Sequence, residues 1–246
     1  MDKQSSLALF ARGREAWNAW ALAAEAELDK IVRDGDWTWR PDSGCDIEFT
    51  NPRADRWHLE HAVDFSYHEF TGRADFSGFI FPGFAMFAGA KFLSEADFSH
   101  IEVQRAICFN YASFGGPTTF ADARIHSEAG FHTVKFLSAA RFERVHILCA
   151  KYEPDMRGYI SFSHARFNGG AHFSRSIFEG YANFPKAQFL GCAEFDGAVF
   201  RRSADLDETQ FQGPASFKGA SFPKGMDFSG ALFALRPNLQ GTGCRI

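Results

Sequence analysis

The phenylalanines of this chain recur at alternating steps of five and six residues, and this spacing restricts the fold more than any other feature. From Phe65 to Ile147 every step obeys the rule, and from Phe162 to Phe233 it is obeyed again. Of the 30 phenylalanines, 26 occupy these positions. Neither step matches the 3.6-residue period of an amphipathic helix. The pattern therefore predicts a repeat built from short extended segments.

Each phenylalanine closes a segment whose residues alternate in character. The residue two positions earlier is usually alanine and the residue between them is often polar, as in Ala74-Asp75-Phe76 and Ala193-Glu194-Phe195. This alternation is typical of an extended segment with one buried face. Glycine and proline follow at many junctions, among them Pro82-Gly83 and Gly213-Pro214, and they indicate a corner after each segment.

Segments this short do not form stable separate hairpins, but they can form the sides of a coil that stacks on itself. Four steps advance the chain by 22 residues, so the pattern predicts a four-sided coil. Residues 22 apart then lie one above the other at the ~4.8 Å spacing of hydrogen-bonded strands. Phe65, Phe87, Phe109 and Phe131 are expected to form one internal column of stacked rings.

Several units resemble those of the pentapeptide repeat proteins, whose five-residue unit holds a small residue, then Asp or Asn, then Leu or Phe. The matching segments are Ala74-Asp75-Phe76-Ser77-Gly78, Ala96-Asp97-Phe98-Ser99 and Ala204-Asp205-Leu206, and the resemblance extends over about residues 59 to 233. It implies an all-β fold, a right-handed quadrilateral β-helix. The common subtype steps by five throughout, so the sixth residue is expected to bulge at alternate corners.

Three segments are expected along the chain: residues 1–58 as an N-terminal capping segment, 59–235 as the β-helix, and 236–246 as a tail. Residues 7–32 are predicted to form one helix with Trp17 and Trp20 on its apolar stripe. We expect this helix to cover the open end of the coil; a partner-binding helix is the alternative. Residues 33–58 are expected to be an irregular join.

The repeat is interrupted once, at about residues 148–161. Ile147 and Phe162 are fifteen residues apart, where the rule requires sixteen or seventeen. Residues 150–152 still fit one unit, and residues 153–159 are expected to form a loop. Such a loop is either a tolerated irregularity or a place for binding residues.

No catalytic, cofactor-binding or metal-binding motif is present, so the chain is not expected to be an enzyme. Trp57-His58-Leu59-Glu60-His61 brings two histidines and a glutamate together but is not HExxH. The five cysteines form no CxxC pair, so we expect reduced thiols in a cytoplasmic protein. The longest apolar stretches fall short of a membrane span, and no membrane association is expected.

The charge of the chain is mild and uneven. The formal net charge is -4, yet residues 160–246 carry nine Lys and Arg against seven Asp and Glu. Some pentapeptide repeat proteins imitate B-form DNA with acidic faces and occupy topoisomerases, so the resemblance permits that function. Here Asp75 and Asp97 would share a face with Thr119 and Arg141, where acid gives way to base. A DNA mimic is therefore disfavoured, and nucleic-acid binding is not expected.

The favoured hypothesis is a non-catalytic scaffold that binds a protein partner through its outer faces, because regular solenoids offer long, flat surfaces. Ile177 and Val199, 22 residues apart, are expected to form an outward apolar pair suited to such contact. A structural spacer is the alternative. At the C-terminal end the short tail is expected to cover Phe233 incompletely, with Leu235 helping, so an end-to-end homodimer is expected there.

Overall fold

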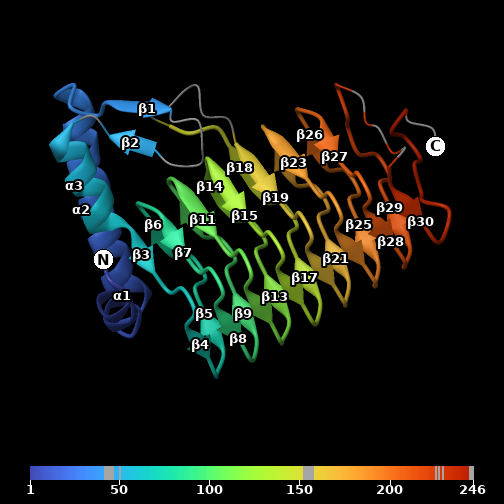
Figure 1. Ribbon diagram of the computed structural model, residues 1–246, viewed down its shortest axis with the longest axis horizontal. Coiled ribbons are helices and arrows are strands. Elements are labelled where there is room, and N and C mark those ends of the chain that lie inside the picture. Colours follow the sequence, from blue (N-terminus) through green and yellow to red (C-terminus); the bar gives the residue numbers. More distant parts are fainter. Residues whose placement is uncertain are drawn as a thin grey trace.

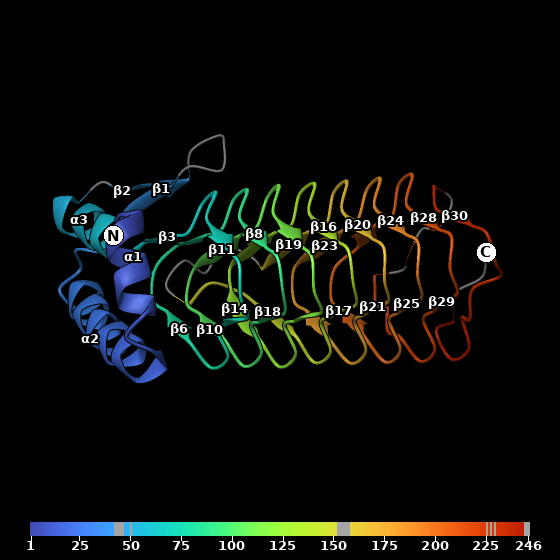
Figure 2. The ribbon, with the colours of Figure 1, turned by 90° about the horizontal axis from the view of Figure 1, so that it is seen from below.

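The computed structural model describes residues 1–41, 47–49, 51–151, 158–224, 226, 228 and 230–243. Three helices gather at one end, and a four-sided parallel β-solenoid of about seven coils extends from them to the C-terminus (Figure 1). The view from below shows the coils stacked along one axis, with the helices covering the first coil (Figure 2). The four-sided coil expected from the 22-residue spacing is confirmed.

Each side of the coil is one parallel sheet, and we number these faces I to IV in the order that the chain meets them. Face I comprises β3 (Val63–Asp64), β7 (Ala85–Met86), β11 (Ala106–Cys108), β15 (Glu128–Gly130), β19 (Tyr159–Ser161), β23 (Tyr181–Asn183) and β27 (Ala204–Asp205). Face II comprises β4 (Glu69–Phe70), β8 (Lys91–Phe92), β12 (Ser113–Phe114), β16 (Lys135–Phe136), β20 (Arg166–Phe167), β24 (Gln188–Phe189), β28 (Gln210–Phe211) and β30 (Leu232–Phe233).

Faces III and IV complete the coil. Face III comprises β5 (Ala74–Asp75), β9 (Ala96–Asp97), β13 (Thr118–Thr119), β17 (Ala140–Arg141), β21 (Ala171–His172), β25 (Ala193–Glu194) and β29 (Ala215–Ser216). Face IV comprises β6 (Ile80–Phe81), β10 (Glu102–Val103), β14 (Arg124–His126), β18 (His146–Leu148), β22 (Ile177–Phe178) and β26 (Val199–Phe200). Outside the interruption, paired residues are 22 apart, as in Asp75 with Asp97 and Gln188 with Gln210.

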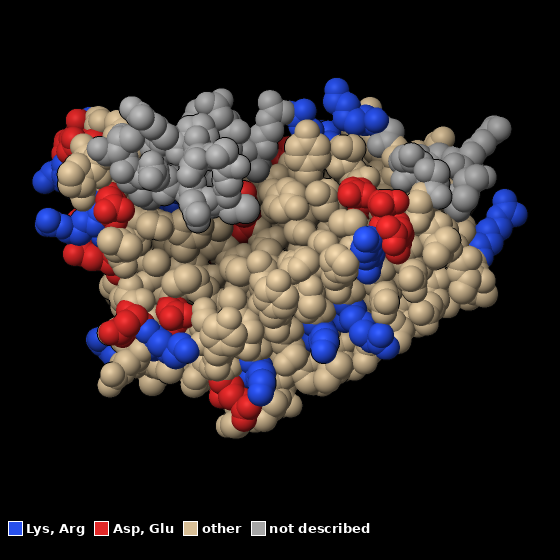
Figure 3. All heavy atoms as spheres, in the orientation of Figure 1, with Lys and Arg blue, Asp and Glu red and all other residues tan. Residues whose placement is uncertain are grey.

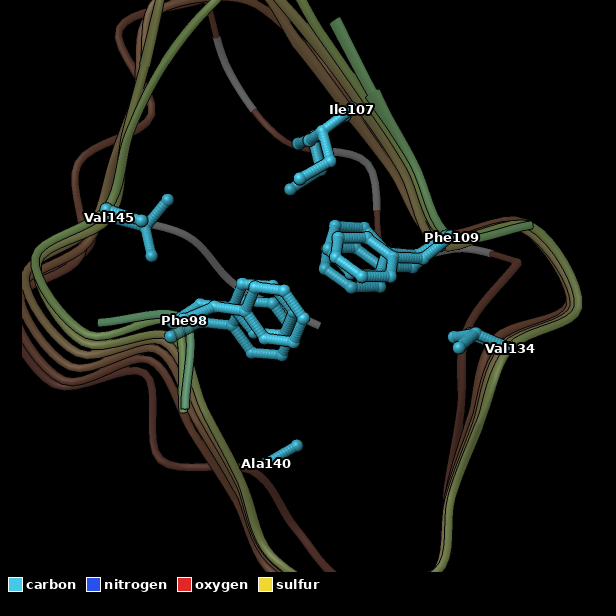
Figure 4. Packing of buried hydrophobic residues seen from close by; sticks show 14 of the residues in the cluster. Phe98, Ile107, Phe109, Val134, Ala140 and Val145 are labelled. Atoms are coloured by element: carbon cyan, nitrogen blue, oxygen red, sulfur yellow. The ribbon is translucent and has the colours of Figure 1, made fainter. Parts of the chain in front are cut away.

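The core consists of stacked phenylalanine rings. The ring of Phe98 lies parallel to that of Phe120, with centroids 5.0 Å apart, and meets Phe109 edge-on at 5.1 Å. Figure 4 shows the columns of Phe98 and Phe109 pointing toward one another across the coil. Offset-stacked and edge-to-face contacts are the two arrangements that aromatic rings prefer. Most of the alanines two residues earlier are also buried, as expected from their small side chains.

The two step lengths correspond to two kinds of corner. In most five-residue steps the second residue after the inward side chain has a positive φ, for example Tyr67 (57°), Gly78 (68°) and Tyr111 (63°). This left-handed conformation turns the chain sharply and costs non-glycine residues some energy. The six-residue steps turn the corner almost entirely without positive φ, because the additional residue lets the chain turn more gradually.

The N-terminal cap consists of α1 (Lys3–Phe10), α2 (Arg14–Arg33) and α3 (Pro52–His61). The single helix predicted over residues 7–32 is wrong in one respect: Gly13, with φ at 85°, divides it into α1 and α2. The irregular join predicted for residues 33–58 is also corrected. It contains the antiparallel strands β1 (Trp39–Pro41) and β2 (Ile47–Phe49), and α3, which begins after the N-cap Asn51.

The cap covers the first coil with both rings and hydrogen bonds. Phe10 stacks on Phe76 at 4.4 Å, and the buried Trp17 donates from its Nε1 to the Ile80 carbonyl at 2.7 Å. The Asn18 amide pairs with the edge strand β6, since its Nδ2 donates to the Gly78 carbonyl and its Oδ1 accepts from the Ile80 N–H. Backbone groups that would otherwise offer a free sheet edge are thus satisfied by the cap.

The interruption is an insertion and not a lost residue. Across it, Lys135 pairs with Arg166 and Phe131 stacks on Phe162, so partners are 31 positions apart instead of 22. Nine residues are therefore inserted between β18 and β19, and the register resumes unchanged. The unit predicted at residues 150–152 is wrong, because β19 continues the coil directly after β18. Tyr152 and most of the predicted loop at 153–159 lie outside the described residues.

None of the described helices has the length and apolar character of a membrane-spanning segment.

Candidate partner-binding surface

Face II and its two bordering corners carry most of the large apolar side chains that the described residues expose. Ten such side chains are exposed, and six belong to this surface: Tyr67, Leu93, Tyr111, Leu137, Leu232 and Leu235. Tyr67 and Tyr111 lie at the corner between faces I and II. Leu232 lies on face II, and Leu93, Leu137 and Leu235 follow its strands at the corner with face III. Exposed apolar groups gathered on one face are typical of an interaction surface.

The two tyrosines are held outward by their backbone. Both occupy left-handed corner positions and are 78% and 63% exposed. Between them lies Gly89, where a methyl group would meet the Tyr67 ring at 2.6 Å. The Tyr111 ring is steadied by an edge contact with His132, 5.4 Å between centroids. The corner therefore presents two rings whose positions are set by the coil, so little freedom remains to be lost on binding.

The middle of face II is mostly polar, with three basic residues and one acidic residue among its eight outward positions. The first five of these, along successive strands, are Glu69, Lys91, Ser113, Lys135 and Arg166. The Lys91 Nζ lies 3.7 Å from the Glu69 carboxylate, and Arg166 donates to the Gln188 amide oxygen at 3.0 Å. Face II thus combines apolar edges with a basic centre.

The predicted pair on face IV is brought together as expected. Ile177 and Val199 are Cα partners on β22 and β26, and Ser221 continues the column. Both side chains are half-buried. Beside them the Glu179 carboxylate lies 3.4 Å from the His146 Nε2 and 3.7 Å from the Arg201 Nε. This pair offers less apolar surface than face II.

The predicted tryptophans belong to the cap. Trp17 is fully buried against Phe65, Phe79 and Phe81, so it offers no surface to a partner while the cap is docked. Trp20 is half-buried and stacks on His61 at 5.9 Å.

At the other end Phe233 closes the ring column of face II, 4.7 Å from Phe211, and is half-buried. Leu235 is 53% exposed.

Face III bears the mixed charge that its sequence predicts. Asp75, Asp97, Thr119 and Arg141 lie on successive strands. Hydrogen bonds from Ser77 hold the pKa of Asp75 below its usual range, and Arg73 lies 3.3 Å from the Asp97 carboxylate. In Figure 3 acidic and basic side chains are scattered among uncharged ones, and neither sign forms a continuous stripe on the face shown. The face shown therefore lacks the row of negative charges with which a DNA mimic would imitate phosphates.

Burial shifts the pKa of three half-buried titratable groups, Cys108, Glu128 and His58. Burial raises the pKa of the Cys108 thiol, which disfavours the nucleophilic thiolate. Burial also raises the pKa of Glu128 on the neighbouring strand β15. Burial first, and the nearby Arg105 second, lower the pKa of His58 to about 4. Arg105 itself lies 5.0 Å from the Trp37 ring and 5.6 Å from the Phe84 ring, where it joins the cap to the coil.

Apart from Leu235, sequence reasoning missed the exposed residues of face II. A usable signal was present, because Tyr67 and Tyr111 are 44 residues apart and so are Leu93 and Leu137. That separation is two coils, so each pair had to lie in one column. Aromatic and leucine side chains at positions other than the inward ones are the pattern to look for.

Comparison with known proteins bears on the repeats alone. Residues 154–198 and 195–236 match the family model described as pentapeptide repeats (9 copies). Neither the curated proteins nor the solved structures include a significant match to this chain.

Proposed function

Because this chain is a pentapeptide repeat protein, we propose that it is a non-catalytic scaffold that binds a protein partner through face II. The observation that carries the proposal is the concentration of exposed tyrosine and leucine side chains on that face. Tyrosine is prominent among the residues that dominate binding energy at protein interfaces. The partner surface is proposed to combine apolar groups with acidic ones, complementary to Lys91, Lys135 and Arg166.

The solenoid itself suits this function. Its interior is filled with stacked rings, so chemistry and recognition are left to the outer faces. A spacer without a partner is the alternative, but it gives no reason for tyrosines to stand outward at corners. A DNA-mimic function would require rows of carboxylates, whereas on face III Asp75 and Asp97 are followed by Thr119 and Arg141. Cys108, Cys149 and Cys192 are free thiols, and we propose a reducing compartment, the cytoplasm.

The test is a comparison of captured proteins between surface variants. Three baits are used: wild type, Tyr111→Ser with Leu137→Ser on face II, and Tyr181→Ser as the control. Tyr181 is 45% exposed on face I, so the control removes a similar ring elsewhere. We expect a protein that wild type and control retain and the face II variant loses. Its purified form is expected to bind the face II variant at least ~10-fold more weakly. If no protein distinguishes the face II variant from the control, the proposal fails.

We also propose that the C-terminal end pairs with a second copy of the chain. The last strand β30 leaves Leu232 60% exposed, and Leu235 beyond it is 53% exposed. Two copies end to end would bury these side chains within a closed two-fold dimer. Light scattering at micromolar concentration is expected to give twice the 27.5 kDa chain mass. Leu235→Glu is expected to restore the monomer, whereas Leu137→Glu, equally exposed at mid-rod, leaves the dimer intact. A monomer mass at every concentration contradicts the pairing.

A further inference from the structure

A histidine, a cysteine and a glutamate meet on face III, away from the proposed partner surface. His172 on β21 and Glu194 on β25 are Cα partners in neighbouring coils, and both point outward. The His172 Nδ1 lies 2.9 Å from the Glu194 Oε2. Cys192 is two residues before Glu194, so the alternation of the extended chain places its thiol on the same side. The register of the coil, and not a local sequence motif, brings His172 to the other two.

A glycine provides the space that this group shares. A methyl group at Gly170 would lie 2.7 Å from the His172 Nε2 and 2.9 Å from the Cys192 Sγ. Both atoms therefore face the same small volume, which any other residue at this position would fill. Gly170 does not have a left-handed φ, so its backbone does not require glycine. We infer that glycine is present here because a side chain would occupy the space between His172 and Cys192.

His172, Cys192 and Glu194 offer a nitrogen, a sulfur and an oxygen atom as metal ligands. One ligand atom from each lies within 4.8 Å of the others, and all three residues are half-buried. Within the described ranges no other group of His, Cys, Asp and Glu meets the same condition. Imidazole, thiolate and carboxylate together are typical ligands of Zn²⁺, at distances of about 2.0–2.3 Å. Side-chain movements of ~1 Å bring donors at this separation to a common tetrahedral centre.

We propose that His172, Cys192 and Glu194 bind one Zn²⁺ ion over Gly170, with a fourth position open to water. The Glu194 side chain is more exposed than that of His172. On zinc binding its carboxylate turns from the imidazole to the ion. The site links β21 to β25, so bound zinc ties two successive coils together. Zinc binding deprotonates the thiol and releases its proton. This inference concerns face III and stands independently of the partner proposed for face II.

The experiment is a titration of the reduced full-length protein with zinc chloride, followed by calorimetry. We expect one ion per chain. Cys192→Ser removes a ligand, and Gly170→Ala fills the shared space while keeping all three proposed ligand residues. Both are expected to lower the affinity about tenfold or more, and Cys149→Ser, which changes an exposed thiol outside the group, is expected to leave it unchanged. Thermal unfolding without metal checks that each variant folds.

A second readout identifies the thiolate directly. With Co²⁺ in place of Zn²⁺, the wild type and Cys149→Ser are expected to show a sulfur-to-cobalt charge-transfer absorption, and Cys192→Ser is expected to lack it. Excess Zn²⁺ is also expected to raise the unfolding temperature of the wild type and not that of Cys192→Ser. Zinc binding that is insensitive to both Cys192→Ser and Gly170→Ala, or a wild type without the cobalt–sulfur absorption, would overturn the proposal as adventitious binding only.

Discussion

Replacement of Phe120 by alanine is expected to destabilise the protein by about 3–5 kcal/mol. The Phe120 ring lies between those of Phe98 and Phe142, with centroids 5.0 and 4.9 Å away and nearly parallel planes, and it is 1% exposed. Its removal leaves a cavity whose walls are themselves stacked rings. These cannot collapse into the gap without breaking their own column. Urea unfolding of the two proteins measures the difference.

Two variants serve as controls for this result. Phe120→Leu retains much of the volume and is expected to cost less than the alanine variant. Leu137→Ala removes an apolar side chain that is 52% exposed and is expected to change stability by less than about 0.5 kcal/mol. If Phe120→Ala unfolds at the same urea concentration as wild type, the ring does not support the core in the way described.

Deletion of residues 1–35 is expected to make the protein aggregate. The deletion removes α1 and α2, and with them Phe10 and Trp17, which cover the first rings of the columns. It also removes Asn18, whose amide completes the hydrogen bonding of the edge strand β6. The first coil would then offer both open strand edges and an uncovered core, which is the usual route to association of solenoids. Size-exclusion chromatography of the truncated chain gives the outcome.

A substitution on the outer surface of the cap is the control. It tests whether aggregation follows from uncovering the first coil or from any change in the helices. Leu22 is on α2 and is 55% exposed, so Leu22→Ser is expected to remain as soluble as the wild type. A truncated chain that stays soluble and keeps the wild-type oligomeric state would show that α1 and α2 are dispensable for the coil. A partner-binding function for these helices would then be favoured.

The coil could be predicted from the sequence because its rule is local and repeated many times. Every inward position carries the same information, so a single Val103 or Ile147 in place of phenylalanine does not obscure the spacing. The cap has no such redundancy. Gly13 interrupts an otherwise continuous apolar stripe, and only its φ of 85° shows that the chain turns there. The stripe alone is compatible with one helix.

The interruption was misread because the sequence permits two registers. Counting steps from Ile147 to Phe162 gives nearly three units with one or two residues missing, or one unit with nine residues added. Which is realised depends on whether Phe162 stacks on Phe131, a contact between residues 31 apart that no local pattern reports. The same limit applies to the proposed zinc ligands, since His172 and Cys192 approach one another only through the register of the coil.

The proposed partner surface follows from the fold more than from residue types. Tyrosine and leucine are ordinary core residues, and only their place at corners makes Tyr111 and Leu137 exposed. Face II also requires that the coils on either side of the insertion be aligned. Lys135 must lie next to Arg166 for the basic centre to continue along the rod.

The most direct test of this account is therefore a disulfide across the insertion, between Lys135→Cys and Arg166→Cys. Neighbouring parallel strands are ~4.8 Å apart, within the range that a disulfide spans. After mild oxidation, mass spectrometry is expected to find positions 135 and 166 linked. Lys135→Cys with Gln188→Cys, two coils apart on the same face, is expected to remain unlinked. Failure of positions 135 and 166 to link, or equal linkage of the control pair, would contradict the continuous face on which the proposed function rests.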